Sequence, residues 1–501
     1  MKKKLLLIVG CLFFIFTYAQ DYRYTNPTLF SATTIQSNVT FTNAPFIDGP
    51  LHTVESSTTN GDIKMDIFTP TGDSFALRPA IIFTHGGGFI TGNKNHDDMM
   101  AFCDLLAKKG YVTATIDYRQ GFNLVLGNTA MHSTRAVYRG FQDGRSAVRF
   151  LRANAATYGI DPSKVYFAGS SAGAFIALHA IYLDAPSEKP AACNATTYTN
   201  VTIPFFHTAP DLGPFDIGNN LTFNGKPDAV VSLWGAIQST NLITSDNTTP
   251  VLLVHGEADA TVPFNTGSPF GYSALPTTDG SNPIKTKLDV LSFTNNETYF
   301  VAGEPHEFYG VNNGTWSNGT GGNAYWPIVV DKVTQFLWKQ HKPTADYSYS
   351  VSNADVTFSD ISTGSLAWWW DFGDGSTSNS QNPNHNYTTS GNYQVKLYVE
   401  NNIKSWDEIT KTVNVNVLST AAFSNDFISI YPNPTNDFIT LNVTNSSQGT
   451  YYIFDISGKI VMQNPIQNKE LIIDMTEFSQ GIYFIKITTE LGSTTKKIIK
   501  N

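Results

Sequence analysis

Cysteine, positive charge and long hydrophobic runs are all scarce in this chain of 501 residues. It has 3 cysteines, and 32 lysines and arginines stand against 41 acidic residues. So few cysteines cannot build a disulfide scaffold, and a net charge of −9 without clustered cations argues against sequence-independent binding to nucleic acid. The 41% of hydrophobic residues suffice for packed cores, and the length suggests about three domains at roughly 100–200 residues each.

The longest apolar run stands at the start of the chain, where lysines at residues 2–4 precede apolar residues 5–16. Such a run is too short to span a bilayer as a stable helix, and small residues follow it. We therefore predict a secretory signal peptide over residues 1–19, with Gln20 as the new N-terminus; the alternative is a lipoprotein signal with Cys11 in its lipobox. Its removal leaves 29 basic against 41 acidic residues, a net charge of −12, and no later stretch is apolar enough for a transmembrane helix.

Cys103 and Cys193 are the cysteines that remain after this cleavage. In an exported protein they can form one disulfide, or both can be small buried hydrophobic residues. Neither belongs to a CxxC pair, and the sequence leaves both alternatives open.

Short apolar runs alternate with helical segments over residues of about 43–342. The apolar runs are residues 80–83, 112–116, 165–168, 230–233, 251–254 and 299–302. The helical segments are residues 97–109, 141–156, 171–183 and 325–341. This alternation predicts an α/β domain, with a mostly parallel sheet that helices cover on both faces.

The composition changes after Pro343 to serine, threonine, asparagine and tyrosine, in alternating strand patterns without a helical period. The remaining length predicts two all-β modules, residues 343–418 and 419–501. Each has the size of a small β-sandwich.

Ser171 lies at the centre of GSSAG, residues 169–173, directly after the predicted strand 165–168 and before an apolar helix. A nucleophile at such a sharp turn sits in strained backbone, and only small neighbours let strand and helix approach closely. Without this context the same five residues could be a chance glycine-serine turn.

A second glycine-rich segment, HGGGF at residues 85–89, follows the predicted strand 80–83. Its backbone N–H groups can face a developing oxyanion, because glycines carry no side chain that would block them. The alternative is a phosphate-binding loop, but the Lys-Ser/Thr ending of such a loop is absent.

A serine hydroxyl is a poor nucleophile at neutral pH, so this chemistry needs a histidine base and a carboxylate, in the chain order Ser, acid, His. Asp259 follows the predicted strand 251–254, and His306 follows the predicted strand 299–302. Both predicted partners therefore occur in the required order.

Other side chains compete for these roles. Glu257 and Asp246 are alternative acids and His255 is an alternative base, but Asp259 lies past the strand end, where its side chain can turn back over the sheet. We expect other places for the remaining candidates: packing for His179, support of the glycine loop for His85, and unassigned loops for His132 and His207.

Residues of about 45–342 resemble an α/β-hydrolase of the carboxylesterase and hormone-sensitive-lipase-like group. They are close in pattern to secreted bacterial esterases that deacylate plant polysaccharides. The resemblance rests on HGGGF, GSSAG, QDGR at residues 142–145 and YGIDP at residues 158–162. It implies an α/β-hydrolase domain with an N-terminal extension over residues 20–342.

The resemblance also implies roles for single residues. Ser171 would be the nucleophile, His306 the base and Asp259 the residue that orients it. The oxyanion hole would come from the amides of Gly87, Gly88 and Ala172, and neither a cofactor nor a metal would take part. Two positions depart from the pattern: Ser170 stands where relatives often have Asp or Glu, and Gln120 follows Tyr118-Arg119 where they usually continue Leu-Ala-Pro-Glu.

Residues 190–226 lie between the helix after Ser171 and the next predicted strand. They carry Phe205, Phe206, Pro210, Phe215 and Phe223. The segment can be a cap that sets substrate choice, or a crossover insertion with a small core of its own. Trp234 and Trp316 are further candidates for pocket walls, with ordinary packing as the alternative.

Residues 343–418 resemble a PKD-type β-sandwich, with WDFGDG at residues 370–375. The alternation of a strand places Trp368, Trp370 and Phe372 on one face. If that face is the core, Trp369 should be exposed and could stack on a sugar or polymer surface. The alternative is a spacer with an incidental tryptophan.

Residues 419–501 contain YPNPTN at residues 431–436 and resemble a C-terminal sorting domain of the type IX secretion system of Bacteroidetes-like bacteria. This implies the secretion machinery as a partner and a place outside the cell or on its outer membrane.

The sequence thus predicts a secreted serine carboxylic-ester hydrolase, acting on acetyl or feruloyl esters of polysaccharides. The alternatives are a lipid or polyester esterase, an oligopeptidase-like serine peptidase, and a non-catalytic surface-binding protein on a hydrolase scaffold.

Overall fold

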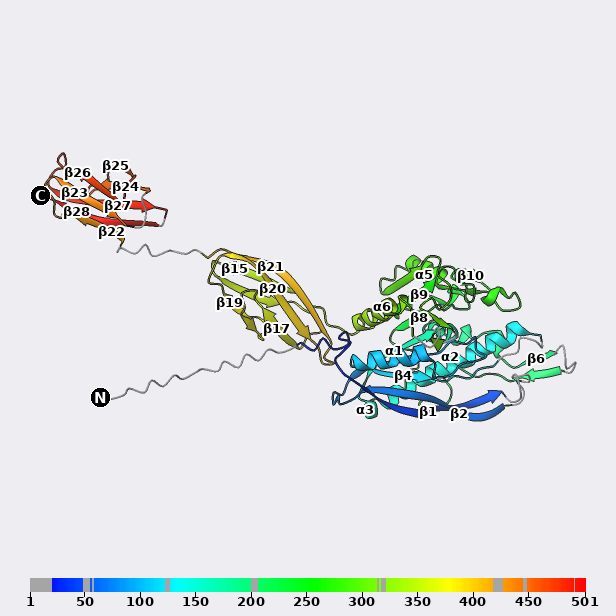
Figure 1. Ribbon diagram of the computed structural model, residues 1–501. Coiled ribbons are helices and arrows are strands. Elements are labelled where there is room, and N and C mark those ends of the chain that lie inside the picture. Colours follow the sequence, from blue (N-terminus) through cyan, green and yellow to red (C-terminus); the bar gives the residue numbers. More distant parts are fainter. Residues whose placement is uncertain are drawn as a thin grey trace, which may run out of the picture. The chain divides into compact units, whose positions relative to one another are not determined.

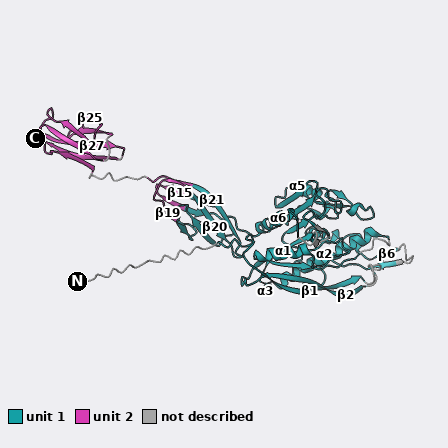
Figure 2. Ribbon diagram, in the orientation of Figure 1, with its two compact units in different colours: residues 1–349, 358–383, 394–412 teal, residues 350–357, 384–393, 413–501 magenta. Residues whose placement is uncertain are grey.

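The computed structural model describes most of the chain (Figure 1). The described residues are 20–47, 55, 58–121, 127–199, 206–312, 315–316, 321–417, 427–444, 448–490 and 492–501. The predicted signal peptide at residues 1–19 and Phe205 lie outside them. The described chain forms two compact units (Figure 2): the first holds the residues up to Tyr349 with Phe358–Pro383 and Gln394–Thr412, and the second holds Ser350–Thr357, Asn384–Tyr393 and the residues from Val413 onwards.

An eight-stranded sheet lies at the centre of the first unit, in the order β1-β2-β4-β3-β5-β8-β9-β12. Neighbours from β4 to β12 pair in parallel, whereas β1 and β2 pair antiparallel at one edge. The strands are β1 (Thr33–Ile47), β2 (Thr58–Pro70), β3 (Arg78–Thr84), β4 (Val112–Ile116), β5 (Ile160–Ser170), β8 (Val230–Leu233), β9 (Val251–Gly256) and β12 (Asn296–Val301). This sheet confirms the predicted α/β class.

Helices cover both faces of the sheet (Figure 1). Ile82 and Phe83 follow each other in β3 but belong to separate apolar clusters, because successive strand residues point to opposite faces. One cluster includes residues of α2 (Thr129–Ala153), α4 (Ala172–Tyr182) and α5 (Ser281–Val290), and the other includes residues of α1 (Asp97–Lys108) and α6 (Tyr325–Lys339). Burial on both faces explains why the strands read as unbroken apolar runs. No helix of the described chain is long and apolar enough to cross a membrane.

Helix α2 starts at Thr129, well before its predicted start, and it contains His132, which was expected in a loop. Its first half buries Arg135 and Arg139, whose guanidinium groups pair with the carboxylate of Glu55. Burial alone would raise the pKa of Glu55, but the hydrogen bond to His132 and the two arginine charges outweigh it and lower the pKa to about 2. Buried charged side chains thus occupy positions where a helix normally carries apolar ones. For this reason the apolar pattern did not predict the first half of α2.

A buried ion pair ties α2 to the loop after β4. Arg119 Nη2 lies 2.8 Å from Asp143 Oδ1, and both side chains are almost fully buried. The backbone amide of Arg119 donates a further hydrogen bond of 2.8 Å to Asp143 Oδ2. The loop that follows β4 is therefore held against the helix by charge and by a backbone hydrogen bond.

We expect Asp143→Asn to lower the free energy of unfolding of this domain by roughly 3–5 kcal/mol, because it leaves the guanidinium of Arg119 buried without its counter-charge. The control Asp289→Asn breaks the exposed pair with Lys285 on α5 and should cost less than about 0.5 kcal/mol. Urea unfolding followed by tryptophan fluorescence measures both changes. Equal losses in the two variants would contradict this account of the ion pair.

After α6, the described chain is made of two groups of strands and their connections. The first group forms the sheets β15-β16-β19 and β18-β17-β20-β21, and the second forms β22-β23-β26 and β25-β24-β27-β28, with antiparallel pairing. Their bounds are β15 (Tyr347–Ser352), β16 (Asp355–Asp360), β17 (Ala367–Asp371), β18 (Thr377–Ser378), β19 (Asn384–Asn386), β20 (Gly391–Glu400), β21 (Trp406–Val415), β22 (Ile428–Tyr431), β23 (Phe438–Val443), β24 (Gly449–Phe454), β25 (Ile460–Ile466), β26 (Glu470–Asp474), β27 (Gly481–Thr489) and β28 (Gly492–Lys500).

The tryptophans of β17 differ from the prediction in two respects. Trp370 and Phe372 are buried, but Trp368 on the same predicted face is only half-buried, and Trp369 is half-buried instead of exposed. Trp369 pairs with Tyr398 of β20, and side chains at paired positions lie on the same face of a sheet. Tyr398 and Trp369 therefore lie on the same face of this sheet.

Cys103 and Cys193 are both free and buried. Of the two alternatives left open by the sequence, the structure therefore shows the pair of small buried side chains and not the disulfide.

Candidate active site

Ser171 connects β5 to α4 in a strained conformation. Its φ is 52° and its ψ is −116°, a region that residues with a Cβ rarely occupy. A Cβ on Gly169 would lie 2.1 Å from the carbonyl oxygen of Gly173, and a Cβ on Gly173 would lie 2.2 Å from the carbonyl oxygen of Thr84. Only glycine fits at both positions, so strand and helix meet closely at Ser171.

The structure brings Ser171, Asp259 and His306 together. His306 Nε2 lies 3.0 Å from Ser171 Oγ, and His306 Nδ1 lies 2.6 Å from Asp259 Oδ2. Asp259 follows β9 and His306 follows β12, two parallel strands whose carboxyl ends lie at the same edge of the sheet as the end of β5. Since Asp259 is acceptor-only when ionised, His306 Nδ1 carries the proton and Nε2 can accept the proton of the serine hydroxyl.

The second oxygen of Asp259 is also held. Asp259 Oδ1 accepts hydrogen bonds from the amides of Thr261 (2.8 Å) and Val262 (2.9 Å). Burial alone would raise the pKa of Asp259, but hydrogen bonds from His255 and His306 outweigh it and lower the pKa to about 2. The carboxylate is therefore ionised throughout the neutral pH range.

His255, the alternative base, lies on the other side of Asp259. Its Nε2 is 3.2 Å from Asp259 Oδ2 and 3.1 Å from the carbonyl oxygen of Val262, so this nitrogen must donate. Its Nδ1 lies 2.8 Å from the hydroxyl of Ser281. His255 thus supports the acid, and it makes no contact with Ser171.

The alternative acids Glu257 and Asp246 are both exposed. In the part of the chain that the structure describes, neither contacts His306.

The glycine loop is braced from behind by two aromatic rings. The rings of His85 and Tyr118 stack with their centroids 4.4 Å apart, and the hydroxyl of Tyr118 lies 3.3 Å from the carbonyl oxygens of His85 and Gly86. His85 Nδ1 donates to the carbonyl oxygen of Gly86 at 2.6 Å. Burial lowers the pKa of His85 to about 3, so the ring is neutral and acts as a fixed support.

Gly88 and Ala172 line the same pocket as Ser171. Gly87 has a φ of +107°, and a Cβ there would lie 2.1 Å from the carbonyl oxygen of Thr91. Among the described residues, the amides of Gly87, Gly88 and Ala172 have no hydrogen-bond acceptor. These amides can therefore donate hydrogen bonds to a bound molecule.

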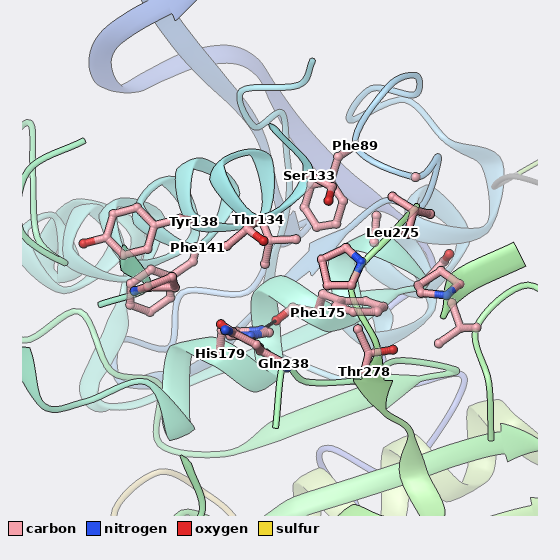
Figure 3. A pocket seen from close by; sticks show the side chains of 18 of the residues that line it. Phe89, Ser133, Thr134, Tyr138, Phe141, Phe175, His179, Gln238, Leu275 and Thr278 are labelled. Atoms are coloured by element: carbon pink, nitrogen blue, oxygen red, sulfur yellow. Dashed lines mark hydrogen bonds between the residues drawn. The ribbon is translucent and has the colours of Figure 1, made fainter. Parts of the chain in front are cut away.

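The pocket beside Ser171 has mainly apolar walls (Figure 3). Helix α2 contributes Tyr138 and Phe141, helix α4 contributes Phe175, and Phe89 of the glycine loop and Leu275 complete the apolar lining. The labelled polar side chains that line the pocket are those of Ser133, Thr134, His179, Gln238 and Thr278. The arrangement suits a substrate with an apolar group next to the reacting carbonyl.

His179 was expected in packing and also borders this pocket. Its Nδ1 donates to the carbonyl oxygen of Phe175 at 2.7 Å, and burial lowers its pKa to about 4. The neutral ring adds no charge to the pocket.

The candidate pocket walls Trp234 and Trp316 lie elsewhere. Trp234 is fully buried, and its Nε1 donates to the hydroxyl of Ser170 at 2.9 Å. Trp316 packs edge to face on Trp326, at a centroid distance of 4.7 Å. Both tryptophans are thus packing residues, the alternative that the sequence had left open.

The described residues of the segment 190–226 share a small apolar cluster with residues of α2. Phe215 packs on Tyr138 and Phe141 beside Cys193, and Phe223 is exposed. The segment contains η3 (Ala191–Cys193) and a hairpin of β6 (Thr196–Thr199) and β7 (Phe206–Ala209), which includes His207. Its one contribution to the pocket among the described residues is Pro190.

The pocket residues of α2 were missed at the sequence level. Ser133, Thr134, Val137, Tyr138 and Phe141 share one face of the helix at spacings of three and four residues. This periodicity could have indicated the face, but only if the helix had been extended back to Thr129.

No cluster of three or more potential metal ligands is found within the described ranges.

The family comparisons agree with this geometry. Residues 65–271 match the BD-FAE family model. The chain therefore carries an α/β-hydrolase domain. After this hydrolase domain, residues 341–417 match the PKD domain and residues 429–501 match the secretion system C-terminal sorting domain, which confirms both resemblances.

Curated relatives match the hydrolase domain over short stretches. A probable isoprenylcysteine alpha-carbonyl methylesterase of Oryza sativa subsp. japonica is 32% identical over 114 residues, 23% of this chain and 24% of that protein. Juvenile hormone esterase of Heliothis virescens is 35% identical over 113 residues, 22% of this chain and 19% of that protein. A neuroligin-like protein of Caenorhabditis elegans is 32% identical over 133 residues, 26% of this chain and 17% of that protein. The chain thus spans about a quarter or less of the length of these relatives.

Among solved structures, esterase 2 of Thermogutta terrifontis covers 57% of this chain and 92% of its own, at 20% identity and a TM-score of 0.39. A likeness of this size carries no argument about activity.

The low pKa of Asp259 predicts a pH-dependent contribution to stability. A carboxyl group with a pKa of about 2 when folded and about 3.8 when unfolded stabilises the protein by roughly 2 kcal/mol above pH 4, and the gain is lost as the pH falls toward 2. We expect wild type to exceed Asp259→Asn in free energy of unfolding at pH 6 by about this amount, and the difference to close near pH 2. Urea unfolding at both pH values tests this, with Asp289→Asn as an exposed control; a gap that stays constant with pH would refute it.

Proposed function

We propose that this protein is an exported serine carboxylic-ester hydrolase that works through an acyl-enzyme. One observation carries the proposal: the hydrogen-bonded line from Ser171 Oγ through His306 to Asp259 ends at the apolar pocket. The matched family model and the esterases among the curated relatives support the same class of activity.

The reaction has two halves. Ser171 Oγ attacks the ester carbonyl carbon while its proton passes to His306 Nε2, and the alcohol leaves with that proton. Water then attacks the acyl-enzyme, gives a proton to His306 Nε2, and the acid departs as the proton returns to Ser171 Oγ. Asp259 stays ionised through the cycle, orients the imidazole through Nδ1 and stabilises its charged form.

The tetrahedral intermediates carry a negative charge on the former carbonyl oxygen. We assign its stabilisation to the amides of Gly87, Gly88 and Ala172. These amides lack an acceptor within the described chain, and the bracing of the glycine loop by His85 and Tyr118 fixes the loop before substrate binds.

Ser171→Ala should lower kcat/KM for p-nitrophenyl acetate by roughly 10³-fold or more, because the remaining groups cannot form the acyl-enzyme. A fluorophosphonate probe should label the wild type and not the variant. Ser245→Ala, at an exposed position, is the control and should behave as wild type in both assays. Unchanged hydrolysis by Ser171→Ala would reject the assignment.

For the substrate, we propose acetyl or feruloyl esters of polysaccharides. The aromatic lining provided by Phe141 and Phe175 suits a bulky apolar acyl group, and the sorting domain suits a substrate outside the cell. Product analysis on acetylated xylan, feruloylated arabinoxylan and tributyrin separates this class from lipid esters.

Val137→Phe tests whether the acyl group enters this pocket. Val137 lines the pocket, so the larger ring should fill it and lower kcat/KM for methyl ferulate by about 10–100-fold, while p-nitrophenyl acetate changes by less than about threefold. The control Ile328→Phe adds the same ring at an exposed site on α6. Equal effects on the two esters would place the acyl group elsewhere.

Two further activities remain alternatives to test. A serine peptidase would prefer amides in a panel of matched esters and amides, and a non-catalytic surface-binding protein would resist the fluorophosphonate probe.

The proposed export rests on the predicted signal peptide and on the matched sorting domain. We propose a signal peptide over residues 1–19, the hydrolase domain over 20–342, the PKD domain over 343–418 and the sorting domain over 419–501. The matched sorting domain supports secretion or display on the outer surface of a Bacteroidetes-type cell.

A further inference from the structure

A second carboxylate lies beside the histidine of the site. Glu307 follows His306 directly and is buried, with its side chain turned inward. Its Oε1 is 4.0 Å from His306 Nε2, the nitrogen that faces Ser171. An anion at this distance interacts with any charge that the imidazole acquires.

The backbone of Glu307 has a strained conformation. Its φ is 52°, a left-handed conformation that residues with a Cβ rarely adopt. A Cβ at Gly86 would lie 3.3 Å from Glu307 Oε1 and 3.2 Å from Ser171 Cβ, so the carboxylate packs directly under the glycine loop. A strained backbone conformation of this kind is kept only where contacts with the surrounding structure hold it in place.

The hydroxyl of Ser170 lies within hydrogen-bond distance of this carboxylate. Ser170 Oγ accepts a hydrogen bond from Trp234 Nε1 at 2.9 Å, and an indole nitrogen can only donate. The hydroxyl proton of Ser170 can then be donated to Glu307 Oε1, which lies 3.3 Å away. The hydrogen-bonded series Trp234–Ser170–Glu307 thus ends beside His306 Nε2, the nitrogen that takes up the proton of the serine nucleophile.

We propose that Glu307 is a positioning residue for the reaction, which stabilises the protonated form of His306 from the side of Nε2. Asp259 acts on Nδ1, whereas Glu307 acts where the proton from Ser171 arrives. Glu307 touches neither the substrate nor the reacting atoms, and it works through His306. The inference rests on the proposed function, since it concerns the same proton transfer.

Other titratable groups face this cluster from neighbouring elements. Tyr309 donates from its hydroxyl to Asp98 Oδ2 of α1 at 2.9 Å, and Asp98 is fully buried, so that burial raises its pKa to about 6. On the other side, Asp259 contacts both His255 and His306. Because Asp98 and Asp259 are retained in every variant below, a change in the pH profile reports on the charge of Glu307.

The test is the steady-state kinetics of Glu307→Gln in the full chain with p-nitrophenyl acetate. The amide oxygen can still accept from Ser170, so the variant removes charge and keeps shape. We expect kcat to fall about tenfold with little change in KM, and the acidic limb of the kcat/KM profile to move to lower pH by about 1, because the histidine loses a neighbouring anion. A purely structural role would leave that limb in place.

Glu304→Gln is the matched control. Glu304 lies in the same loop, is half-buried, and its Oε1 accepts from the hydroxyl of Tyr325 at 2.9 Å. This variant removes the same charge from the same loop, and both kcat and the pH profile should stay as in wild type. A shift of equal size in both variants would assign the effect to net charge and overturn the specific role of Glu307.

The double variant Ser170→Asp/Glu307→Ser keeps the proposal falsifiable if Glu307→Gln is unstable, which urea unfolding would detect. It moves the carboxylate to the other side of the 3.3 Å contact, as the shorter aspartate, and an aspartate at position 170 can still accept from Trp234. We expect it to recover at least half of the shift in the acidic limb. An unchanged limb in Glu307→Gln, or no recovery in the folded exchange, overturns the proposal, whereas an active Ser171→Ala would instead overturn the proposed function.

Discussion

The sharp turn at Ser171 is the constraint on which the rest of the site depends. Gly169 and Gly173 let β5 and α4 approach so closely that each Cα faces a carbonyl oxygen, and the serine between them is held in a conformation with positive φ. The turn therefore determines where the hydroxyl group of Ser171 lies. Because β8, β9 and β12 continue the sheet in parallel beside β5, the loops that follow β9 and β12 can deliver Asp259 and His306 to that place.

Much of this arrangement could be predicted from the sequence, for a physical reason. Strands buried on both faces read as apolar runs, and the side chains that follow such runs in a parallel sheet lie at one edge of it. Ser171, Asp259 and His306 each follow an apolar run, and this position favoured them over the other candidates for nucleophile, acid and base. The first half of α2 could not be found in this way. It buries Arg135 and Arg139 against a distant carboxylate, and ion pairs between remote residues leave no periodic mark in the sequence. The pocket face on the same helix was lost with it.

In helix α2, buried charged side chains hold the helix in position, and apolar side chains line the pocket. Its arginines and Asp143 are tied to Glu55 and Arg119, which fixes the helix without large apolar side chains at those positions. Tyr138 and Phe141 are then free to line the pocket. Glu307 escaped prediction for a related reason, because neighbours in sequence gave no sign that a strained backbone turns its carboxylate back toward His306.

The two buried cysteines have a practical meaning for handling the protein. Burial raises the pKa of the Cys103 thiol and brings that of the Cys193 thiol to about 12, so the reactive thiolate is virtually absent in the folded state. No covalent crosslink within the described chain has to form, which makes a reducing host cytoplasm a suitable place for production. On a chain produced without residues 1–19, and so without Cys11, an alkylating dye would label unfolded molecules and leave folded molecules unlabelled, which gives a measure of how much of each preparation is intact.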